Sequence, residues 1–281
     1  MDRLENIDFC IRYLMEQDKV EAEMPDTLEG KQRLMRALMN ITEVEHKADP
    51  GALPRCSNVT EDGIWEPRAL SEEFLLAQDA ELQAQLEEKG VVDCDCAPMY
   101  GKESSLSLWQ GDITRLRVDA IVNAANSRGL GCWHPLHACI DNCIHSAAGL
   151  QLRLECDNIL RGGEIATGEA IITRGYNLPS KYVIHTVGPI IATGIPTAEQ
   201  EEQLAMCYRN CLRLAEERGC HSIAFCCIST GEFRFPNRRA AEIAVRTVRS
   251  ALALRRSSIK VIFNVFKDKD YDIYRELLGK N

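Results

Sequence analysis

The sequence lacks the features of a membrane protein and of an exported protein. No uninterrupted apolar run approaches the roughly 20 residues of a membrane span. The N-terminus does not have the basic-then-apolar form of a secretory signal. Hydrophobic residues make up 45% and charged residues 27% of the 281 residues, which is typical of a globular protein. We therefore expect a cytoplasmic protein that does not bind membranes.

An excess of positive charge is also missing. The chain has 33 Lys and Arg residues against 42 Asp and Glu residues, for a formal net charge of -9. Proteins that bind long nucleic acids depend on basic side chains that neutralise phosphates. The composition therefore argues against a nucleic-acid partner. It still allows a small anion to bind, because backbone amides can hold one without basic side chains.

Catalytic motifs are missing from the first hundred residues, which contain no phosphate loop, nucleophile elbow or repeat. Apolar residues there recur at the spacing of one helix face, as in Leu4, Ile7, Ile11 and Leu14. A second helix start is predicted at Ser71, with a stop at Gly90. Residues 46–67 are rich in proline and glycine and predict a loop. Residues 1–104 are therefore expected to form a helical N-terminal extension.

From residue 105 onward, short β-branched apolar runs alternate with helical stretches. The predicted strands are Leu106–Trp109, Val118–Val122, Ala170–Thr173, Tyr182–Val187, Ile223–Ile228 and Ile259–Val265. Thr197 and Gln200 form a capping box for a helix that runs to Glu217, and another helix is predicted to begin near Asn237. This alternation predicts an α/β fold with a mainly parallel sheet over residues 105–281. Ligands of such sheets bind at the carboxyl ends of the strands, so the loops that follow the strands matter most.

Three of these loops are distinctive in their polar and small residues. They are Gly111–Thr114, Asn123–Asn126 and Ser229–Phe233. The amides around Gly231 can cradle a diphosphate, helped by the positive end of the helix that follows. Taken alone, Gly111–Thr114 and Asn123–Asn126 are better explained as ordinary capped turns, and a Ser/Thr turn is an alternative for Ser229–Phe233.

A fourth loop is dense in cysteine and histidine. Cys132, His137 and Cys139 form a Cys-x4-His-x-Cys set that could surround one tetrahedral zinc ion and leave a position open. The spacing matches no standard zinc-finger motif, so a hydrophobic loop with incidental thiols is an equal alternative. The chain has 13 cysteines, but without an export signal a disulfide framework is not expected.

In combination, these segments resemble the macrodomain family of ADP-ribose modules from Leu106 to the C-terminus. The motifs that carry the resemblance are Gly111–Thr114, Val118–Asn126, Ile144–Gly149, Gly168–Thr173 and His185–Pro189. The family implies a three-layer α/β/α sandwich with a mixed, mainly parallel sheet. The cysteine-rich segment from Gly131 to Cys139 replaces a run of glycines and resembles the zinc-dependent microbial subclass, which also carries a helical N-terminal extension.

The resemblance implies a zinc-dependent hydrolase that removes mono-ADP-ribose from modified side chains of proteins, most plausibly Asp or Glu. One zinc ion per chain would be held by Cys132, His137 and Cys139. The partners implied are ADP-ribose and mono-ADP-ribosylated protein. By analogy with the subclass, a sirtuin-like transferase and a lipoyl carrier protein are expected as further partners.

The resemblance also assigns roles to residues. Asp112 would accept a hydrogen bond from the adenine amino group, and Asn126 would bind the distal ribose. The residues expected to contact ADP-ribose are Asp112, Ile113, Asn126, Ile140, Asp141, Ser229, Thr230, Gly231, Glu232 and Phe233. Asn126 and Asp141 would be catalytic, with Asp141 orienting or deprotonating a water or holding a ribose hydroxyl. The alternative role for Asp141 is a helix N-cap.

Alternatives remain open at the level of mechanism and function. The zinc ion could activate a water or orient the substrate, and we favour orientation because two thiolates neutralise its charge. The module could instead bind ADP-ribose without cleaving it, or act as a phosphatase on ADP-ribose 1''-phosphate. Away from the site, His185, Cys207 and Cys211 are expected to be core residues.

Overall fold

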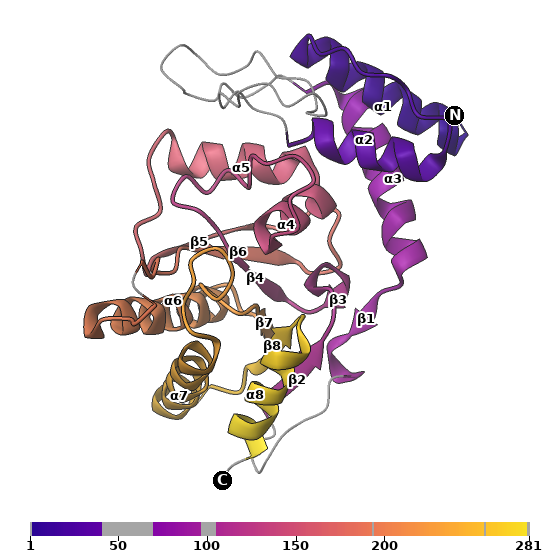
Figure 1. The fold of residues 1–281 in the computed structure, drawn as a ribbon. Helices are drawn as coiled ribbons and strands as arrows, with labels where there is room; N and C mark the ends of the chain where they lie inside the picture. The colour runs from indigo at the N-terminus through magenta and orange to yellow at the C-terminus, as the bar shows by residue number, and fades with distance from the viewer. Residues whose placement is uncertain (1, 41–69, 97–104, 193, 256, 280–281) are drawn as a thin grey trace. The chain divides into compact units, whose positions relative to one another are not determined.

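A computed structural model describes residues 2–40, 70–96, 105–192, 194–255 and 257–279 (Figure 1). The predicted loop over residues 46–67 lies outside these ranges, and so does the expected domain boundary after residue 104. The chain divides into two compact units. Unit 1 consists of Met1–Lys89 and Leu130–Gly162, and unit 2 of Gly90–Gly129 and Gly163–Asn281. The segment that carries the Cys–His set therefore belongs to the same unit as the N-terminal helices.

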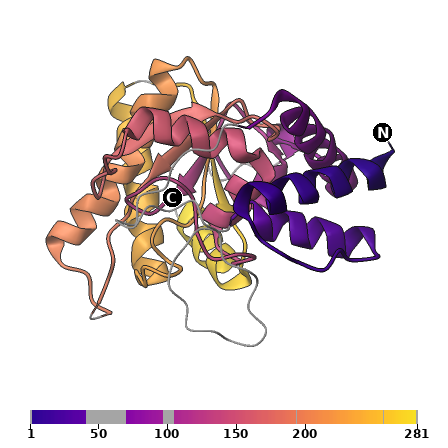
Figure 2. The same cartoon turned by 90° about the horizontal axis from the view of Figure 1, so that it is seen from above.

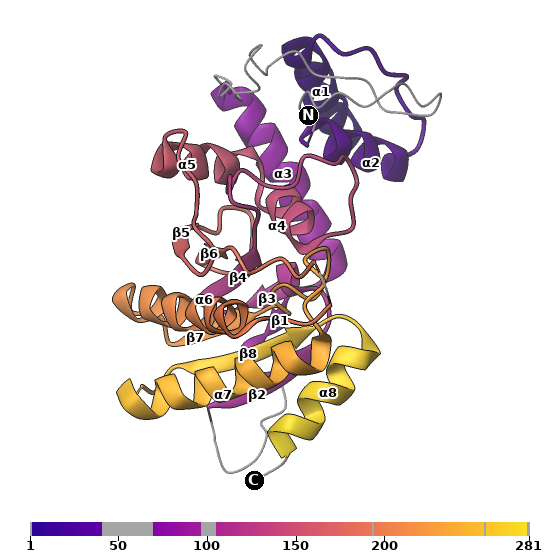
Figure 3. The ribbon, with the colours of Figure 1, turned by 60° about the vertical axis from the view of Figure 1, so that its left-hand side comes forward.

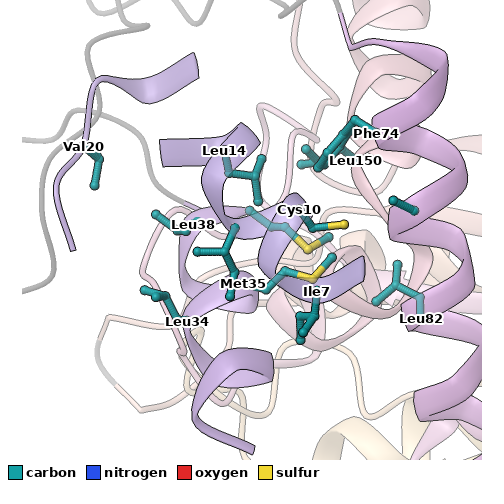
Figure 4. Packing of buried hydrophobic residues seen from close by; sticks show 13 residues of the cluster. Ile7, Cys10, Leu14, Val20, Leu34, Met35, Leu38, Phe74, Leu82 and Leu150 are labelled. Carbon is teal, nitrogen blue, oxygen red and sulfur yellow. The ribbon is translucent and has the colours of Figure 1, made fainter. Parts of the chain in front are cut away.

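Unit 1 is helical. Its helices are α1 (Arg3–Asp18), α2 (Leu28–Leu38), α3 (Glu72–Lys89), α4 (Ile140–Ala148) and α5 (Leu150–Leu160). Helix α1 packs against both α2 and α3, and Figure 2 shows α1 and α2, in indigo and violet, side by side. Ile7 and Leu14 of α1, Met35 of α2 and Phe74 of α3 are fully or almost fully buried in one apolar cluster (Figure 4). The predicted stripe is wrong at Leu4, which is 49% exposed.

The helix starts in unit 1 follow side-chain caps. Asp2 and Glu5 form a capping box at the start of α1. The hydroxyl of Ser71 accepts a hydrogen bond from the Phe74 amide at 3.1 Å, and α3 begins one residue after Ser71. The predicted helix start at Ser71 is thus confirmed, because this hydroxyl satisfies an amide that has no partner within the helix.

Unit 2 is built on a six-stranded sheet of order β2-β8-β7-β4-β6-β5 (Figure 1). Its strands are β2 (Leu106–Gln110), β4 (Ala120–Ala124), β5 (Ala170–Arg174), β6 (Tyr182–Thr186), β7 (Ser222–Phe225) and β8 (Lys260–Val265). All neighbouring pairs are parallel except β5 with β6. A separate two-stranded parallel sheet pairs β1 (Val92–Asp93) with β3 (Leu116–Arg117).

Unit 2 also contains three long helices, of which two contact the sheet and the third packs against those two. They are α6 (Ala198–Glu217), α7 (Asn237–Arg255) and α8 (Asp268–Gly279). Helix α6 contacts β5 and β6, α8 contacts β2 and β8, and α7 packs against both helices (Figure 3). The capping box of Thr197 and Gln200 and the helix start at Asn237 are confirmed. The mixed, mainly parallel α/β fold with a helical N-terminal region is confirmed as well.

Among the described residues, no helix combines the length and the apolar character that crossing a bilayer requires.

Candidate functional site

In unit 2, the parallel strands bring three of the predicted loops to one edge of the sheet. Strands β2, β8, β7 and β4 are consecutive parallel neighbours, so the segments that follow them all start at the same edge. The segment after β2 carries Asp112 and Ile113, the segment after β4 carries Asn126, and the segment after β7 carries Ser229–Phe233. The sheet topology thus gathers the ADP-ribose contacts that the sequence predicts for unit 2.

Asp112 starts a short 3-10 helix, η2 (Ile113–Arg115), after β2. Its carboxylate accepts hydrogen bonds from the Thr114 amide at 3.0 Å and the Thr114 hydroxyl at 2.7 Å. The preceding Gly111 is fixed to β8, since the Asn264 side chain donates to its carbonyl at 3.0 Å. Asp112 is therefore a cap within a rigid turn, whatever it binds. Asn264, an amide within an apolar strand, is a positioning residue that the motifs did not indicate.

The two amides after β4 have different surroundings. Asn126 is half-buried in the loop, and its Oδ1 accepts a hydrogen bond from the Gly129 amide at 3.2 Å. Asn123 lies within β4 and is fully buried, with its Nδ2 3.1 Å from Nδ1 of His185. The difference arises because Asn123 stands inside the sheet, in a strand between β7 and β6, whereas Asn126 follows the end of β4. Asn126 thus lies in the loop at the end of β4, where ligands of such sheets bind, while Asn123 belongs to the interior of the sheet.

The loop of Ser229–Phe233 is shaped by its backbone. The Ser229 carbonyl accepts from the Phe235 amide at 2.9 Å, and the Phe233 carbonyl accepts from the Ile191 amide at 2.8 Å. Ser229 has a φ of 65°, a strained value for a residue with a side chain. Its hydroxyl lies so close to Gly188 that a Cβ there would be 1.9 Å from Oγ. Strain of this kind gathers at ligand-binding loops, where the surrounding structure maintains it.

The other residues of this loop are more accessible. Thr230 and Phe233 are half-buried, and Gly231 and Glu232 are exposed. A Cβ added at Gly231 would meet nothing within 4 Å. Open space above a loop of backbone amides suits an anion that approaches the main chain closely. Helix α7 begins four residues after Phe233, as the sequence predicted.

In unit 1, residues 131–139 form what we call the Cys–His loop, and its three predicted ligands converge. The ligand atoms of Cys132, His137 and Cys139 all lie within 4.8 Å of one another. Sγ of Cys132 is 3.4 Å from Nδ1 of His137. In a tetrahedral zinc site, neighbouring sulfur and nitrogen donors lie about 3.5–3.8 Å apart. The donor set and its spacing therefore fit a zinc ion with three protein ligands.

The two thiols of this loop perturb each other. The pKa of Cys132 is lowered to about 5, and the largest cause is the hydrogen bond that the Cys139 thiol donates to its sulfur. The same contact, together with burial, raises the pKa of Cys139. The pair thus holds one proton between two sulfurs. A thiophilic cation could replace that proton, because thiolates are its preferred ligands.

Cys139 also begins the helix that carries Asp141. Its sulfur accepts a hydrogen bond from the Asn142 amide at 3.4 Å and caps α4. Asp141 is the second residue of α4, so the alternative reading of Asp141 as the N-cap is wrong. Its carboxylate is almost fully buried and lies 3.6 Å from Nε2 of His145. Ile140, the first residue of α4, is half-buried. The buried carboxylate thus follows a candidate metal ligand by two residues.

Gly131 allows the Cys–His loop to begin close to α4. It has a φ of 88°, and a Cβ there would lie 2.9 Å from Cγ of His145. Any side chain would therefore be strained and would collide with the imidazole. The start of the loop is thus fixed by the absence of a side chain, next to the histidine that pairs with Asp141.

Two residues that the sequence did not indicate hold this loop. Arg36 of α2 donates to Oδ1 of Asn142 at 2.8 Å and to the His137 carbonyl at 3.4 Å. Asn142 in turn donates to the His134 carbonyl at 3.0 Å. His134 itself is exposed. Arg36 is more than a hundred residues away from Asn142 along the chain, so no local motif could have linked them.

The residues expected in the core are there. His185 is fully buried, and burial lowers its pKa to about 3. Its Nε2 lies 3.0 Å from the Thr173 hydroxyl and its Nδ1 faces the amide of Asn123. Cys207 and Cys211 are fully buried on α6. Their roles as core residues are confirmed.

Comparison with known proteins identifies the family. The family model "Macro domain" matches residues 122–244. A protein-ADP-ribose hydrolase of Treponema medium is 45% identical over 277 residues, which cover 96% of this chain and 97% of the relative. The chain belongs to the macrodomain family. A protein-ADP-ribose hydrolase of Staphylococcus aureus (strain MRSA252) is 46% identical over 261 residues, covering 92% of this macrodomain protein and 88% of the relative.

Solved macrodomain structures agree with this assignment. The structure of a Trypanosoma brucei macrodomain in complex with ADP-ribose matches with a TM-score of 0.61 and 32% identity. The match covers 75% of this chain and 92% of that one. Because the curated relatives align over almost their whole length and are hydrolases, this macrodomain protein is a hydrolase.

Proposed function

We propose that this macrodomain protein is a zinc-dependent hydrolase that removes mono-ADP-ribose from Asp or Glu side chains of proteins in the cytoplasm. The names of the curated relatives and the ADP-ribose bound to the Trypanosoma brucei macrodomain support ADP-ribosylated protein as the substrate. The observation that carries the proposal is the convergence of Cys132, His137 and Cys139 immediately before the buried Asp141. A module that only binds ADP-ribose needs neither feature.

The loops of unit 2 are proposed to bind the ADP-ribose. Asp112 would accept from the adenine amino group, beside the amide of Ile113. The backbone of Ser229–Phe233 would hold the diphosphate. Backbone amides can bind this anion without basic side chains, which suits a chain with a net charge of -9. Asn126 would bind the distal ribose, whose anomeric carbon carries the bond to be broken.

Asp141 is proposed to act on the attacking water. Its carboxylate accepts a proton from the water as the water oxygen bonds to the anomeric carbon, and the protein carboxylate departs as the anion. Nε2 of His145, 3.6 Å from Oδ1 of Asp141, would help to position this carboxylate. Ile140, the first residue of α4, would contact the ADP-ribose.

A zinc ion bound by Cys132, His137 and Cys139 would supply an open coordination position for a ribose hydroxyl. Two thiolates neutralise the charge of such an ion, which weakens Lewis-acid activation of water and favours orientation of the substrate. The sirtuin-like transferase and the lipoyl carrier protein stay predictions about partners.

Metal analysis and a hydrolysis assay test the proposal together. The purified protein should contain about one zinc ion per chain, and a chelator should abolish the release of free ADP-ribose from a mono-ADP-ribosylated protein. C132A should lose both the metal and at least about 100-fold in turnover, because a three-ligand site loses one ligand. C94A, which changes a half-exposed cysteine of unit 2, should keep both. A C132A protein that lacks metal and keeps full turnover would contradict the proposal.

A further inference from the structure

The end of helix α2 contacts the Cys–His loop through one side chain. Arg36 lies in the last turn of α2. Its Nη2 donates to Oδ1 of Asn142 at 2.8 Å and to the His137 carbonyl at 3.4 Å, and it lies 3.6 Å from the sulfur of Cys143. Its Nε is 3.3 Å from the same Asn142 oxygen. The guanidinium thus bridges a residue of the loop and the first turn of α4, and all of these groups belong to unit 1.

Asn142, the residue that Arg36 contacts, joins both parts of the loop. Its side chain is fully buried and donates to the His134 carbonyl at 3.0 Å. Its backbone amide donates to the sulfur of Cys139 at 3.4 Å. One asparagine therefore holds the middle of the Cys–His loop and the ligand at its end, and Arg36 holds the orientation of that asparagine.

The end of α2 is itself fixed within unit 1. Nδ2 of Asn40 donates to the Arg36 carbonyl at 2.7 Å and to the Ser146 hydroxyl at 3.0 Å. Arg153 of α5 donates to the Met39 carbonyl at 2.8 Å and to Oδ1 of Asn40 at 2.9 Å. The guanidinium of Arg153 also lies 4.4 Å from the ring centroid of Trp133 in the loop. These contacts fix the backbone on which Arg36 stands.

We propose that the helical extension is a working part of the metal site, in which Arg36 holds the Cys–His loop in the conformation where its three ligand atoms converge. The loop residues from 131 to 139 form no helix or strand, so their order depends on such side-chain contacts. Groups that orient metal ligands without touching the metal affect metal affinity about 10–100-fold. The inference rests on the proposed zinc site, and Arg36 is a positioning residue.

Two substitutions at Arg36 and one matched control test this inference in the 281-residue protein. R36Q removes the charge and the paired donors, while R36K keeps the charge and loses the planar fork. R33Q is the control, because Arg33 is an exposed arginine of the same helix. The zinc dissociation constant is measured by competition with a chromophoric chelator, and the thermal midpoint of each zinc-free protein is measured in parallel.

We expect R36Q to weaken zinc binding about 10–100-fold. R36K should show an intermediate loss of zinc affinity. If R36Q fails to fold, the zinc affinity of R36K tests the inference instead. R33Q should bind zinc within about twofold of the original protein, since an exposed side chain away from the loop contributes little. The thermal midpoint of the zinc-free R36Q protein should change far less than that of the zinc-bound protein. A merely structural arginine would lower both midpoints equally and leave the zinc affinity unchanged.

The outcomes separate this inference from the proposed function. Zinc affinity of R36Q and R36K within about twofold of the original protein would overturn the role of Arg36 and leave the proposed function intact. A protein that binds zinc but releases no ADP-ribose would refute the proposed function. The zinc dissociation constants of R36Q, R36K and R33Q would still decide the role of Arg36. An original protein that binds no zinc would refute both.

Discussion

The Cys–His loop of unit 1 and the Ser229–Phe233 loop of unit 2 are held in place by different means. The Cys–His loop depends on side-chain contacts, above all those of the neighbouring Asn142 and of Arg36, which is more than a hundred residues away in the sequence. The Ser229–Phe233 loop continues from a strand of a parallel sheet and is closed by backbone hydrogen bonds. The comparison suggests that single polar substitutions should impair unit 1 strongly, whereas unit 2 should respond mainly to changes that displace its backbone.

The largest effect is expected from D141N in unit 1. The amide has the shape of the carboxylate but cannot take a proton from water, so turnover should fall about 1,000-fold. Zinc content should stay within about threefold of the original protein, because the changed side chain is not proposed as a zinc ligand. Single-turnover hydrolysis and metal analysis measure the two quantities. A D141N protein with more than a tenth of the original turnover would exclude proton acceptance by Asp141.

A smaller effect is expected from a polar side chain of unit 2, and it concerns stability. Burial lowers the folded-state pKa of His185 to about 3, below the value of about 6.5 expected in the unfolded chain. As the pH falls below 6.5, the unfolded chain takes up the proton first, so this stability is present above pH 6.5 and is lost towards pH 3. Between pH 7 and pH 4, His185 should therefore account for a loss of about 3 kcal/mol in the free energy of unfolding.

The H185Q variant isolates this contribution, because glutamine offers hydrogen bonds without a titrating ring. Urea unfolding at pH 7 and pH 4 should show a pH-dependent loss that is about 3 kcal/mol smaller than in the original protein. ADP-ribose affinity at pH 7 should be unchanged. An identical pH dependence in both proteins would mean that His185 is not held neutral by burial.

The smallest of the three effects is expected from G188A, which displaces the backbone of unit 2. A Cβ at this position would lie 1.9 Å from Oγ of Ser229 and 2.8 Å from Cγ2 of Ile228, so the Ser229–Phe233 loop must shift. ADP-ribose affinity should fall at least about tenfold, since the proposed contacts are backbone amides whose direction matters. Zinc affinity should not change. The double variant G188A/S229A should regain part of the lost affinity, and failure to do so would contradict the steric explanation.

Much of the fold could be predicted from local patterns. The capping box of Thr197 and Gln200 and the start of α3 at Ser71 were predicted correctly, because a cap depends on residues three apart. Strand ends were less accurate. Strand β7 ends at Phe225 rather than Ile228, because the Ile228 amide turns back to the Cys226 carbonyl at 3.0 Å. The residues that follow the strand, from Cys226 to Ile228, are apolar as well, so the sequence does not indicate where the strand ends.

The candidate site could be predicted only in part. The spacing of Cys132, His137 and Cys139 predicted a group that the structure brings together. The contact between Arg36 and Asn142, which holds this loop, could not be predicted from a local motif, because the two residues are more than a hundred positions apart. The alternative role of Asp141 as the N-cap of α4 is wrong, because Cys139 occupies that position. Whether zinc binds there stays a prediction.

Unit 1 is assembled from two pieces of chain that the first strands of unit 2 separate. During synthesis, the N-terminal helices therefore leave the ribosome before residues 130–162, which carry the candidate zinc ligands. Unit 1 is complete only after this second piece has been synthesised. A shortened protein that starts near residue 90 would retain the whole sheet of unit 2. It would leave residues 130–162 without the N-terminal helices that share their unit. Experiments on such a fragment would therefore describe the Ser229–Phe233 loop but not the Cys–His loop.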